Sequence, residues 1–171
     1  MKDIIDLQRK IVPEMIGILE KRYNILRNIY YNQPIGRRTL ANSLNIGERI
    51  IRTEVNILKK QGLLEIKSQG MNVTEEGKII IEDLKDFIHR LKGLNGLEKK
   101  LEEKLNISKV IVVPGNYDED NLILKDIGKA SAKYLRKIIN NNSIIGITGG
   151  TTMAQLAEEM PKQKGESDIL V

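Results

Sequence analysis

The sequence predicts two consecutive units, an α+β unit over residues 1–92 and the start of an open α/β unit over residues 93–171. Apolar residues recur at helical spacing in the first unit, whereas short, continuous apolar runs alternate with helical patterns in the second. Gly93 and Gly96 lie where the pattern changes, and glycines between helical patterns are typical of a boundary. The charge divides there too, because the first unit has 17 Lys and Arg against 12 Asp and Glu, and the second has 11 of each.

The first unit begins with predicted helices. Apolar spacing indicates a helix over residues 4–19, bent or broken near Pro13 because proline lacks the backbone N–H of the helical hydrogen bond. A second helix is expected over residues 21–31. A short helix over residues 37–44 is then followed by a tight turn and a further helix over residues 48–61.

A ribbon and a long helix are expected to complete this unit. Gly62 follows the preceding helix, at a position where glycine commonly ends helices. Residues 63–67 and 71–73 flank a Ser-Gln-Gly turn and predict two antiparallel strands, and Thr74 is a suitable N-cap for a helix that ends near Lys92. Helix, helix, turn, helix, two-stranded ribbon and helix is the element order of a winged helix-turn-helix.

The second unit is expected to alternate strands and helices, as the start of an open α/β fold does. Short runs of this kind are typical of strands that are buried on both faces of a parallel sheet. Because the last predicted strand ends with the chain, we expect the sequence to be a fragment of a longer protein. The expected strands are residues 110–113, 144–147 and 168–171, and the expected helices are residues 97–105, 121–139 and 151–160.

Composition excludes several classes of protein and site. The chain has no cysteine and one histidine, His89, which excludes disulfides, thiolate nucleophiles and zinc sites with sulfur ligands. We expect no catalytic residue, no metal site and no cofactor, and we interpret the acidic residues 118–120 as a solvated loop. No apolar run approaches the roughly 20 residues of a membrane span, and the N-terminus does not resemble a signal peptide. A cytoplasmic protein that does not enter membranes is therefore expected.

The helix over residues 48–61 carries the pattern of a base-reading helix. Ile51, Val55 and Leu58 recur on one face and predict contact with the unit's own core. Arginine matches the acceptor pair of guanine in the major groove, and asparagine matches the edge of adenine. The predicted outward stripe that would meet the bases of double-stranded DNA consists of Arg49, Arg52, Thr53 and Asn56.

Three further basic residues are expected to contact DNA phosphates rather than bases. Arg37 and Arg38 begin the preceding helix, and Lys67 lies in the ribbon. The alternative is an ordinary amphipathic helix with solvated arginines, or a protein-interaction module with a solvated basic surface. The ribbon, the turn and the concentration of positive charge together favour DNA binding.

A glycine- and threonine-rich turn in the second unit suits a phosphate group. Gly149, Gly150, Thr151 and Thr152 precede a predicted helix, whose unpaired N–H groups and dipole attract anions. No lysine follows the glycines as it would in a Walker A loop. The alternative, which the residues leave open, is a turn with a purely structural role.

Apolar residues of the helix that ends near Lys92 indicate self-association. The stripe is longer than we expect a small unit to cover, which predicts a homo-oligomer, a dimer or a tetramer, with two base-reading helices on one operator. The stripe consists of Ile80, Leu84, Phe87, Ile88 and Leu91.

Several short stretches together resemble a known family, the SorC/DeoR-type sugar-binding transcriptional regulators, and within it a subfamily that controls glycolytic operons. The resemblance covers nearly the whole chain. The stretches are residues 21–23 (Lys-Arg-Tyr), 34–38 (Pro-Ile-Gly-Arg-Arg), 62–64 (Gly-Leu-Leu), 73–77 (Val-Thr-Glu-Glu-Gly) and 147–152 (Ile-Thr-Gly-Gly-Thr-Thr).

The resemblance implies a repressor with an N-terminal winged helix and an effector domain similar to sugar-phosphate isomerases. It further implies that fructose 1,6-bisphosphate weakens operator binding and that residues 149–152 match the family's phosphate-binding loop. Family members continue for about as many residues again, including the rest of the sugar-phosphate pocket. The alternative from another class is a sugar-phosphate isomerase-like enzyme fused to a small helical domain.

Overall fold

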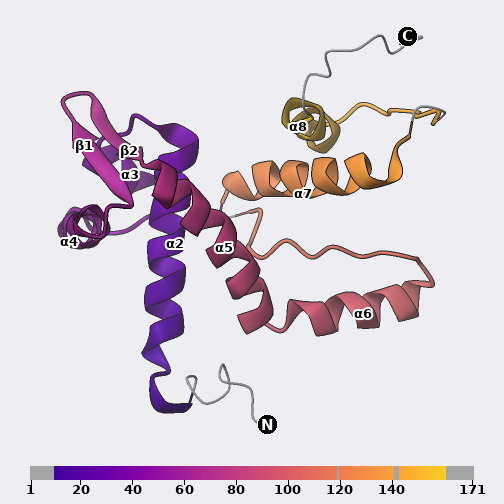
Figure 1. Ribbon diagram of the computed structural model, residues 1–171, viewed down its shortest axis with the longest axis horizontal. Coiled ribbons are helices and arrows are strands. Elements are labelled where there is room, and N and C mark those ends of the chain that lie inside the picture. Colours follow the sequence, from indigo (N-terminus) through magenta and orange to yellow (C-terminus); the bar gives the residue numbers. More distant parts are fainter. Residues whose placement is uncertain (1–9, 119, 141–142, 161–171) are drawn as a thin grey trace. The chain divides into compact units, whose positions relative to one another are not determined.

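The computed structural model describes residues 10–118, 120–140 and 143–160 (Figure 1). The chain divides into two compact units, residues 1–97 and residues 98–171, and each unit is described by itself. The elements of the first unit are the helices α2 (Glu14–Asn32), α3 (Arg37–Ser43), α4 (Glu48–Lys60) and α5 (Glu75–Leu91) and the strands β1 (Leu64–Lys67) and β2 (Gly70–Val73).

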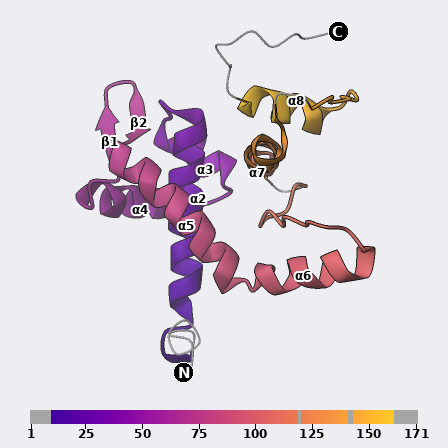
Figure 2. The same ribbon diagram turned by 45° about the vertical axis from the view of Figure 1, so that its right-hand side comes forward.

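The two strands form an antiparallel ribbon in which Leu64 lies opposite Val73 and Lys67 lies opposite Gly70. Ile35, just before α3, adds a single antiparallel bridge to Met71, with hydrogen bonds of 3.3 and 2.9 Å between their backbones. The ribbon lies on the same side of α2 as α4 in both views (Figures 1 and 2), and β1 contacts α4 while β2 contacts α2 and α5. The predicted order of helices and strands is therefore present from α3 to α5.

The start of the unit differs from the sequence prediction. Residues 1–9 lie outside the described residues, and the two predicted helices on either side of Glu20 are one continuous helix, α2. Pro13 occupies its N-cap position, where a missing N–H costs nothing because the first N–H groups of a helix have no partner within it. No helix-breaking residue separates Leu19 from Lys21, so the helix continues.

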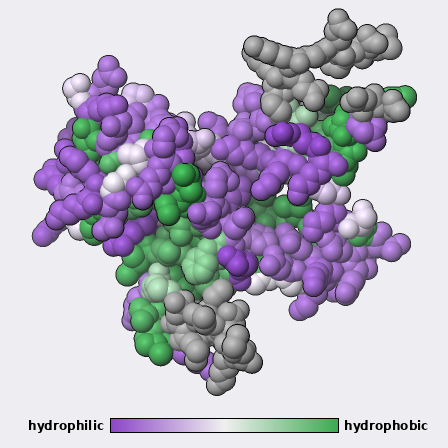
Figure 3. All heavy atoms as spheres, in the orientation of Figure 1, coloured by the Kyte–Doolittle hydropathy of each residue, from purple (hydrophilic) through white to green (hydrophobic). Residues whose placement is uncertain are grey.

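The core of the first unit joins all of its elements, and burial of each large aliphatic side chain stabilises it by about 1.5–3 kcal/mol. The hydrophilic surface over the ribbon, α3 and α4 contrasts with apolar surface before and along the first half of α2 (Figure 3). Ile11 just before α2 and Ile18 within it are exposed. The most deeply buried side chains are Ile25, Leu26 and Ile29 of α2, Leu40 of α3, Ile51 and Val55 of α4, and Met71 of β2.

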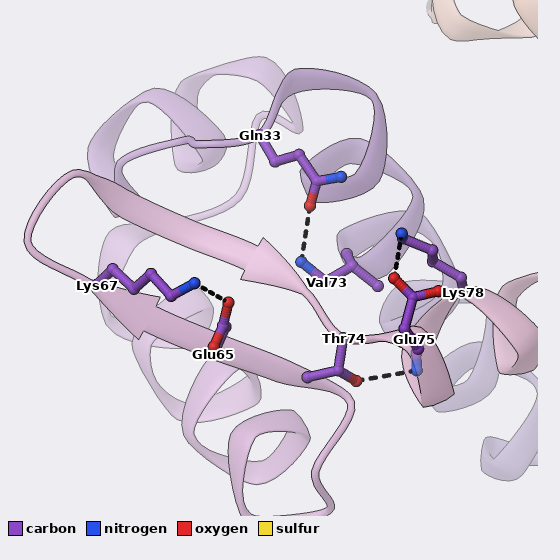
Figure 4. A network of polar contacts seen from close by, with 8 residues as sticks. Gln33, Glu65, Lys67, Val73, Thr74, Glu75 and Lys78 are labelled. Carbon is purple, nitrogen blue, oxygen red and sulfur yellow. Dashed lines mark hydrogen bonds and ion pairs between the residues drawn. The ribbon is translucent and has the colours of Figure 1, made fainter.

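Polar contacts fix the ribbon between α2 and α5 (Figure 4). The side chain of Gln33 accepts a hydrogen bond of 2.8 Å from the backbone N–H of Val73. Thr74 caps α5 as predicted, because its hydroxyl oxygen accepts a hydrogen bond of 3.1 Å from the N–H of Gly77. A side chain at Gly77 would collide with the carbonyl oxygen of Leu63, so glycine lets α5 pack directly against the start of the ribbon.

A buried carboxylate ties α4 to α2. Glu54 of α4 is 6 % exposed, and its two oxygens lie 2.6 Å from Lys21 Nζ and 2.8 Å from Arg22 Nε. Burial alone would raise the pKa of Glu54, but the hydrogen bonds and charges of Lys21 and Arg22 outweigh it and lower the pKa below its ordinary value of 4.5. The charged form of Glu54 therefore stabilises the orientation of α4.

This ion cluster predicts an acid-sensitive contribution to stability. A lowered pKa stabilises the fold above pH 4.5, and the contribution is lost as the pH falls through the folded-state pKa. We expect Glu54→Gln to lower the free energy of unfolding at pH 7 by about 1 kcal/mol, between the values for exposed and fully buried ion pairs. Urea unfolding at pH 7 and at pH 3.5 measures both effects.

The control for this prediction is Glu48→Gln on the same helix, because Glu48 is exposed and its carboxylate lies 3.9 Å from Arg38 Nε. We expect this variant to keep the stability of the parent at both pH values. If Glu54→Gln lost stability below pH 4.5 as steeply as the parent, the proposed contribution of Glu54 would be wrong.

The apolar stripe of α5 is partly buried. Ile88 is 3 % exposed and belongs to the core cluster of the first unit, and Leu84 packs against that cluster. Leu91 is buried outside the cluster, and Ile80 and Phe87 are half-buried. Self-association through this stripe stays a prediction.

The second unit is helical in the part that the structure describes. Its boundary helix α6 (Leu94–Leu105) begins earlier than predicted, because Gly93 adopts a positive φ of 66° and ends α5 in a single residue. The other helices are α7 (Leu122–Ile138) and α8 (Thr151–Glu159), and they pack closely where Gly128 of α7 meets Gln155 of α8.

Two of the three predicted strands of the second unit are not formed in the described residues. Residues 110–113 and 144–147 belong to no strand, and residues 168–171 lie outside the described residues. The N–H groups of Val110 and Val112 instead donate hydrogen bonds of 2.9 Å to the carboxylates of Glu102 and Glu98 on α6. The prediction of a parallel sheet is therefore wrong for the described residues, because a strand requires a neighbour to accept its hydrogen bonds.

Candidate nucleic-acid interface and anion-binding turn

Helix α4 separates an apolar face from a polar one. Ile51, Val55 and Leu58 are at most 3 % exposed and pack into the core of the first unit. The high contrast between the two faces is that of a helix whose outer side is available to a partner. The structure places the whole predicted base-reading stripe on the exposed side: Arg49, Arg52, Thr53 and Asn56.

The residues predicted to contact phosphates are exposed on neighbouring elements. Arg37 and Arg38 occupy the first turn of α3, and Arg38 Nε lies 3.9 Å from the carboxylate of Glu48. Lys67 ends β1 and forms an ion pair of 2.5 Å with Glu65 on the same strand (Figure 4). Because these pairs are exposed, water and salt screen them, and both cations remain accessible to a phosphate.

The basic surface is more local than the sequence indicates. Lys21 and Arg22 pair with Glu54, and Arg27 is 3 % exposed within α2. Arg27 is therefore absent from the outer surface, and Lys21 and Arg22 are half-buried and already paired. The exposed cations between residues 21 and 67 all belong to α3, α4 and β1: Arg37, Arg38, Arg49, Arg52, Lys59, Lys60 and Lys67.

Sequence reasoning missed one member of the α4 stripe. Thr53 and Asn56 lie four and seven residues after Arg49 on one face of the helix. Lys60, which is exposed, lies eleven residues after Arg49 and so continues the same face. Extending the periodic pattern to the end of the helix would have identified it. It also missed Ile50, an exposed isoleucine in the first turn of α4.

Thr53 differs in chemistry from the prediction. Its hydroxyl donates a hydrogen bond of 3.1 Å to the carbonyl oxygen of Arg49, four residues earlier. A threonine hydroxyl has one hydrogen, so in this conformation Thr53 presents an acceptor and a methyl group but no donor.

The predicted anion-binding turn is exposed at the start of α8. Gly150 occupies the N-cap position with φ 144°, and no side chain caps the first turn of this helix. A side chain at Gly150 would find no atom within 4 Å, so open space lies beside the backbone. Gly149, Thr151 and Thr152 are likewise exposed. The preceding residues 144–147 form no strand, so the turn does not follow a sheet strand as predicted.

Two further properties concern metal binding and membranes. Within the described ranges, no three His, Cys, Asp or Glu side chains gather into a group able to hold a metal ion. No helix in this part of the chain combines the length and the apolar character that crossing a membrane requires.

Two family models match the chain consecutively. The "CggR N-terminal DNA binding domain" matches residues 18–88, which include α3, α4 and the ribbon. The "Putative sugar-binding domain" matches residues 89–171, which include the turn before α8. The sequence thus combines a DNA-binding and a sugar-binding type of domain in this order.

Curated proteins match nearly the whole chain. The chain is 38 % identical over 171 residues to the central glycolytic genes regulator of Priestia megaterium. This match includes 99 % of the chain and 50 % of that regulator. The chain is 38 % identical over 170 residues to the same regulator of Bacillus subtilis, with coverage of 99 % and 50 %. A deoxyribonucleoside regulator of Bacillus subtilis is 25 % identical over 136 residues, which are 79 % of the chain and 37 % of the relative.

The chain therefore spans about half the length of the curated relatives that it matches most extensively. Both family models and the similarity over its whole length lead to one assignment. The chain belongs to the family of the central glycolytic genes regulators.

Proposed function

We propose that this chain acts as a DNA-binding transcriptional repressor of glycolytic genes, whose affinity for its operator falls when a sugar phosphate binds. The observation that carries the proposal is the α4 face, on which exposed Arg49, Arg52 and Asn56 lie opposite a fully buried apolar stripe. Such a face presents donors for base edges while the other side holds the helix to its own domain.

The arrangement around α4 suits a winged helix-turn-helix. Helix α3 precedes α4 across a four-residue connection, and the β1–β2 ribbon follows it at once. In such domains the second helix enters the major groove. Cations on α3 and at the end of β1 then meet phosphates beside that groove, which fixes the orientation of the protein on the duplex.

Phosphate contacts predict a steep dependence of DNA binding on salt. A gel shift of the chain with a random-sequence duplex at 50 mM and 200 mM salt tests this, since each neutralised phosphate releases counterions. We expect Arg38→Ala to weaken binding to specific and random duplexes by a similar factor and to reduce the salt slope by about one. Arg90→Ala removes the same charge from the last turn of α5 and is the matched control.

Binding that did not depend on salt would contradict the proposed function. An unchanged salt slope in Arg38→Ala would contradict only the placement of α3 beside a phosphate.

The second domain is proposed to bind the sugar phosphate, with fructose 1,6-bisphosphate as the effector. The exposed helix start at Gly150, Thr151 and Thr152 supports a phosphate site, because backbone N–H groups, hydroxyls and the helix dipole all favour an anion. The match of residues 89–171 to a sugar-binding domain supports the same function.

The relatives of the chain are named as regulators, which favours a cytoplasmic, non-enzymatic role over an isomerase-like enzyme. A homo-oligomer on repeated operator sites completes the proposal.

A further inference from the structure

An isoleucine interrupts the polar face of α4. Ile50 is 50 % exposed although it lies in a regular helical turn, with its N–H donating a hydrogen bond of 2.9 Å to the carbonyl oxygen of Gly47. Ile46, in the connection before α4, packs against the core, whereas Ile50 does not belong to the core cluster. The side chain therefore presents apolar surface from the end of the helix that enters the groove first in the proposed arrangement.

Helix geometry divides the outer face of α4 into two sides. At 3.6 residues per turn, Arg52 and Asn56 lie on one side of Arg49, and Ile50 and Thr53 lie on the other. The first side carries hydrogen-bond donors suited to guanine and adenine. The second side has a different chemistry, because the Thr53 hydroxyl donates to the Arg49 carbonyl and leaves a methyl group as its distinctive feature.

One base presents an apolar group in the major groove, namely thymine through its C5 methyl. We propose that Ile50, with Thr53 beside it, recognises the C5 methyl of a thymine in the operator. The inference rests on the proposed DNA-binding function and adds a base preference to the same face. It also explains why an isoleucine stands among arginines, since burial against a methyl group removes apolar surface of both partners from water.

The experiment first selects duplexes that bind the full 171-residue chain from a random library. Each thymine of the enriched sequence is then replaced by deoxyuridine, which lacks only the C5 methyl group. We expect one such replacement to weaken binding of the parent about fourfold, the factor that corresponds to burying one methyl group. The variant Ile50→Ala is expected to bind the thymine and deoxyuridine duplexes equally, and Ile50→Val to discriminate to an intermediate degree.

The control is Ile79→Ala, because Ile79 is 64 % exposed but lies on α5. We expect this variant to retain the parent's preference for thymine. Equal binding of thymine and deoxyuridine by the parent at every position would overturn the inference and leave the proposed function intact. Undiminished discrimination by Ile50→Ala would assign the methyl contact to another residue and would also overturn it. Failure to enrich or bind any duplex would overturn the proposed function together with the inference.

Discussion

Arg52→Ala is expected to weaken binding to a selected operator duplex by roughly 1–3 kcal/mol, a loss of about fivefold to more than a hundredfold. Arg52 is exposed on α4 on the side of the helix that also carries Asn56. A guanidinium donates two parallel hydrogen bonds to guanine, and alanine leaves both acceptors of the base without a protein partner. Because a base contact is lost, the variant should also tolerate substitution at one base pair that the parent requires.

Fluorescence anisotropy with the selected duplex and with single-base-pair variants measures both effects. Arg90→Ala, which removes an arginine from α5, is expected to keep the affinity and the base preference of the parent. If Arg52→Ala bound the selected duplex as tightly as the parent, Arg52 would not read a base and the proposed placement of α4 in the groove would be wrong.

The predictable part of the first unit follows from local signals. The spacing of Ile51, Val55 and Leu58 determines which face of α4 is buried, and Thr74 determines where α5 begins. These signals act within one or two helical turns, so a single sequence reveals them. The exposed position of the predicted stripe on α4 follows directly from them.

Contacts between distant residues were not predictable in the same way. Glu54 lies three residues after Ile51, on the buried face of α4, where an ionised side chain needs a partner. The partners are Lys21 and Arg22, 33 and 32 residues earlier, which meet both of its oxygens. The same pairing engages two half-buried cations that composition assigns to the DNA-binding surface. Only the packing of α2 on α4 reveals which basic residues remain exposed.

The second unit shows why apolar runs are ambiguous evidence for strands. Residues 110–113 have the composition of a buried strand, but the N–H groups of Val110 and Val112 donate to carboxylates of α6. The hydrogen bond from Val110 N–H and the ion pair with Lys109 lower the pKa of Glu102, which favours the charged acceptor. Composition describes a segment's own preference, whereas a strand also depends on a partner elsewhere in the chain.

The double variant Thr151→Ala/Thr152→Ala is expected to weaken binding of fructose 1,6-bisphosphate about tenfold to a hundredfold. Both hydroxyls are exposed in the first turn of α8, and loss of one hydrogen bond to a charged group costs about 1.5–3 kcal/mol. Gly150→Val should be more severe, because a β-branched residue is strained at φ 144° and its side chain fills the open space beside the backbone. DNA binding without effector should be unchanged, since α4 belongs to the other unit.

Calorimetric titration with fructose 1,6-bisphosphate measures the effector affinity, and a gel shift on the selected duplex measures DNA binding. The control is Ser108→Ala, which removes an exposed hydroxyl of the second unit outside the turn. The two readouts separate the possible results. Unchanged effector affinity in the double alanine variant would place the phosphate elsewhere and leave residues 149–152 as a helix start only. A parallel loss of DNA binding would instead mean that the substitutions damage the protein as a whole, because the hydroxyls of this turn are proposed to serve the ligand alone.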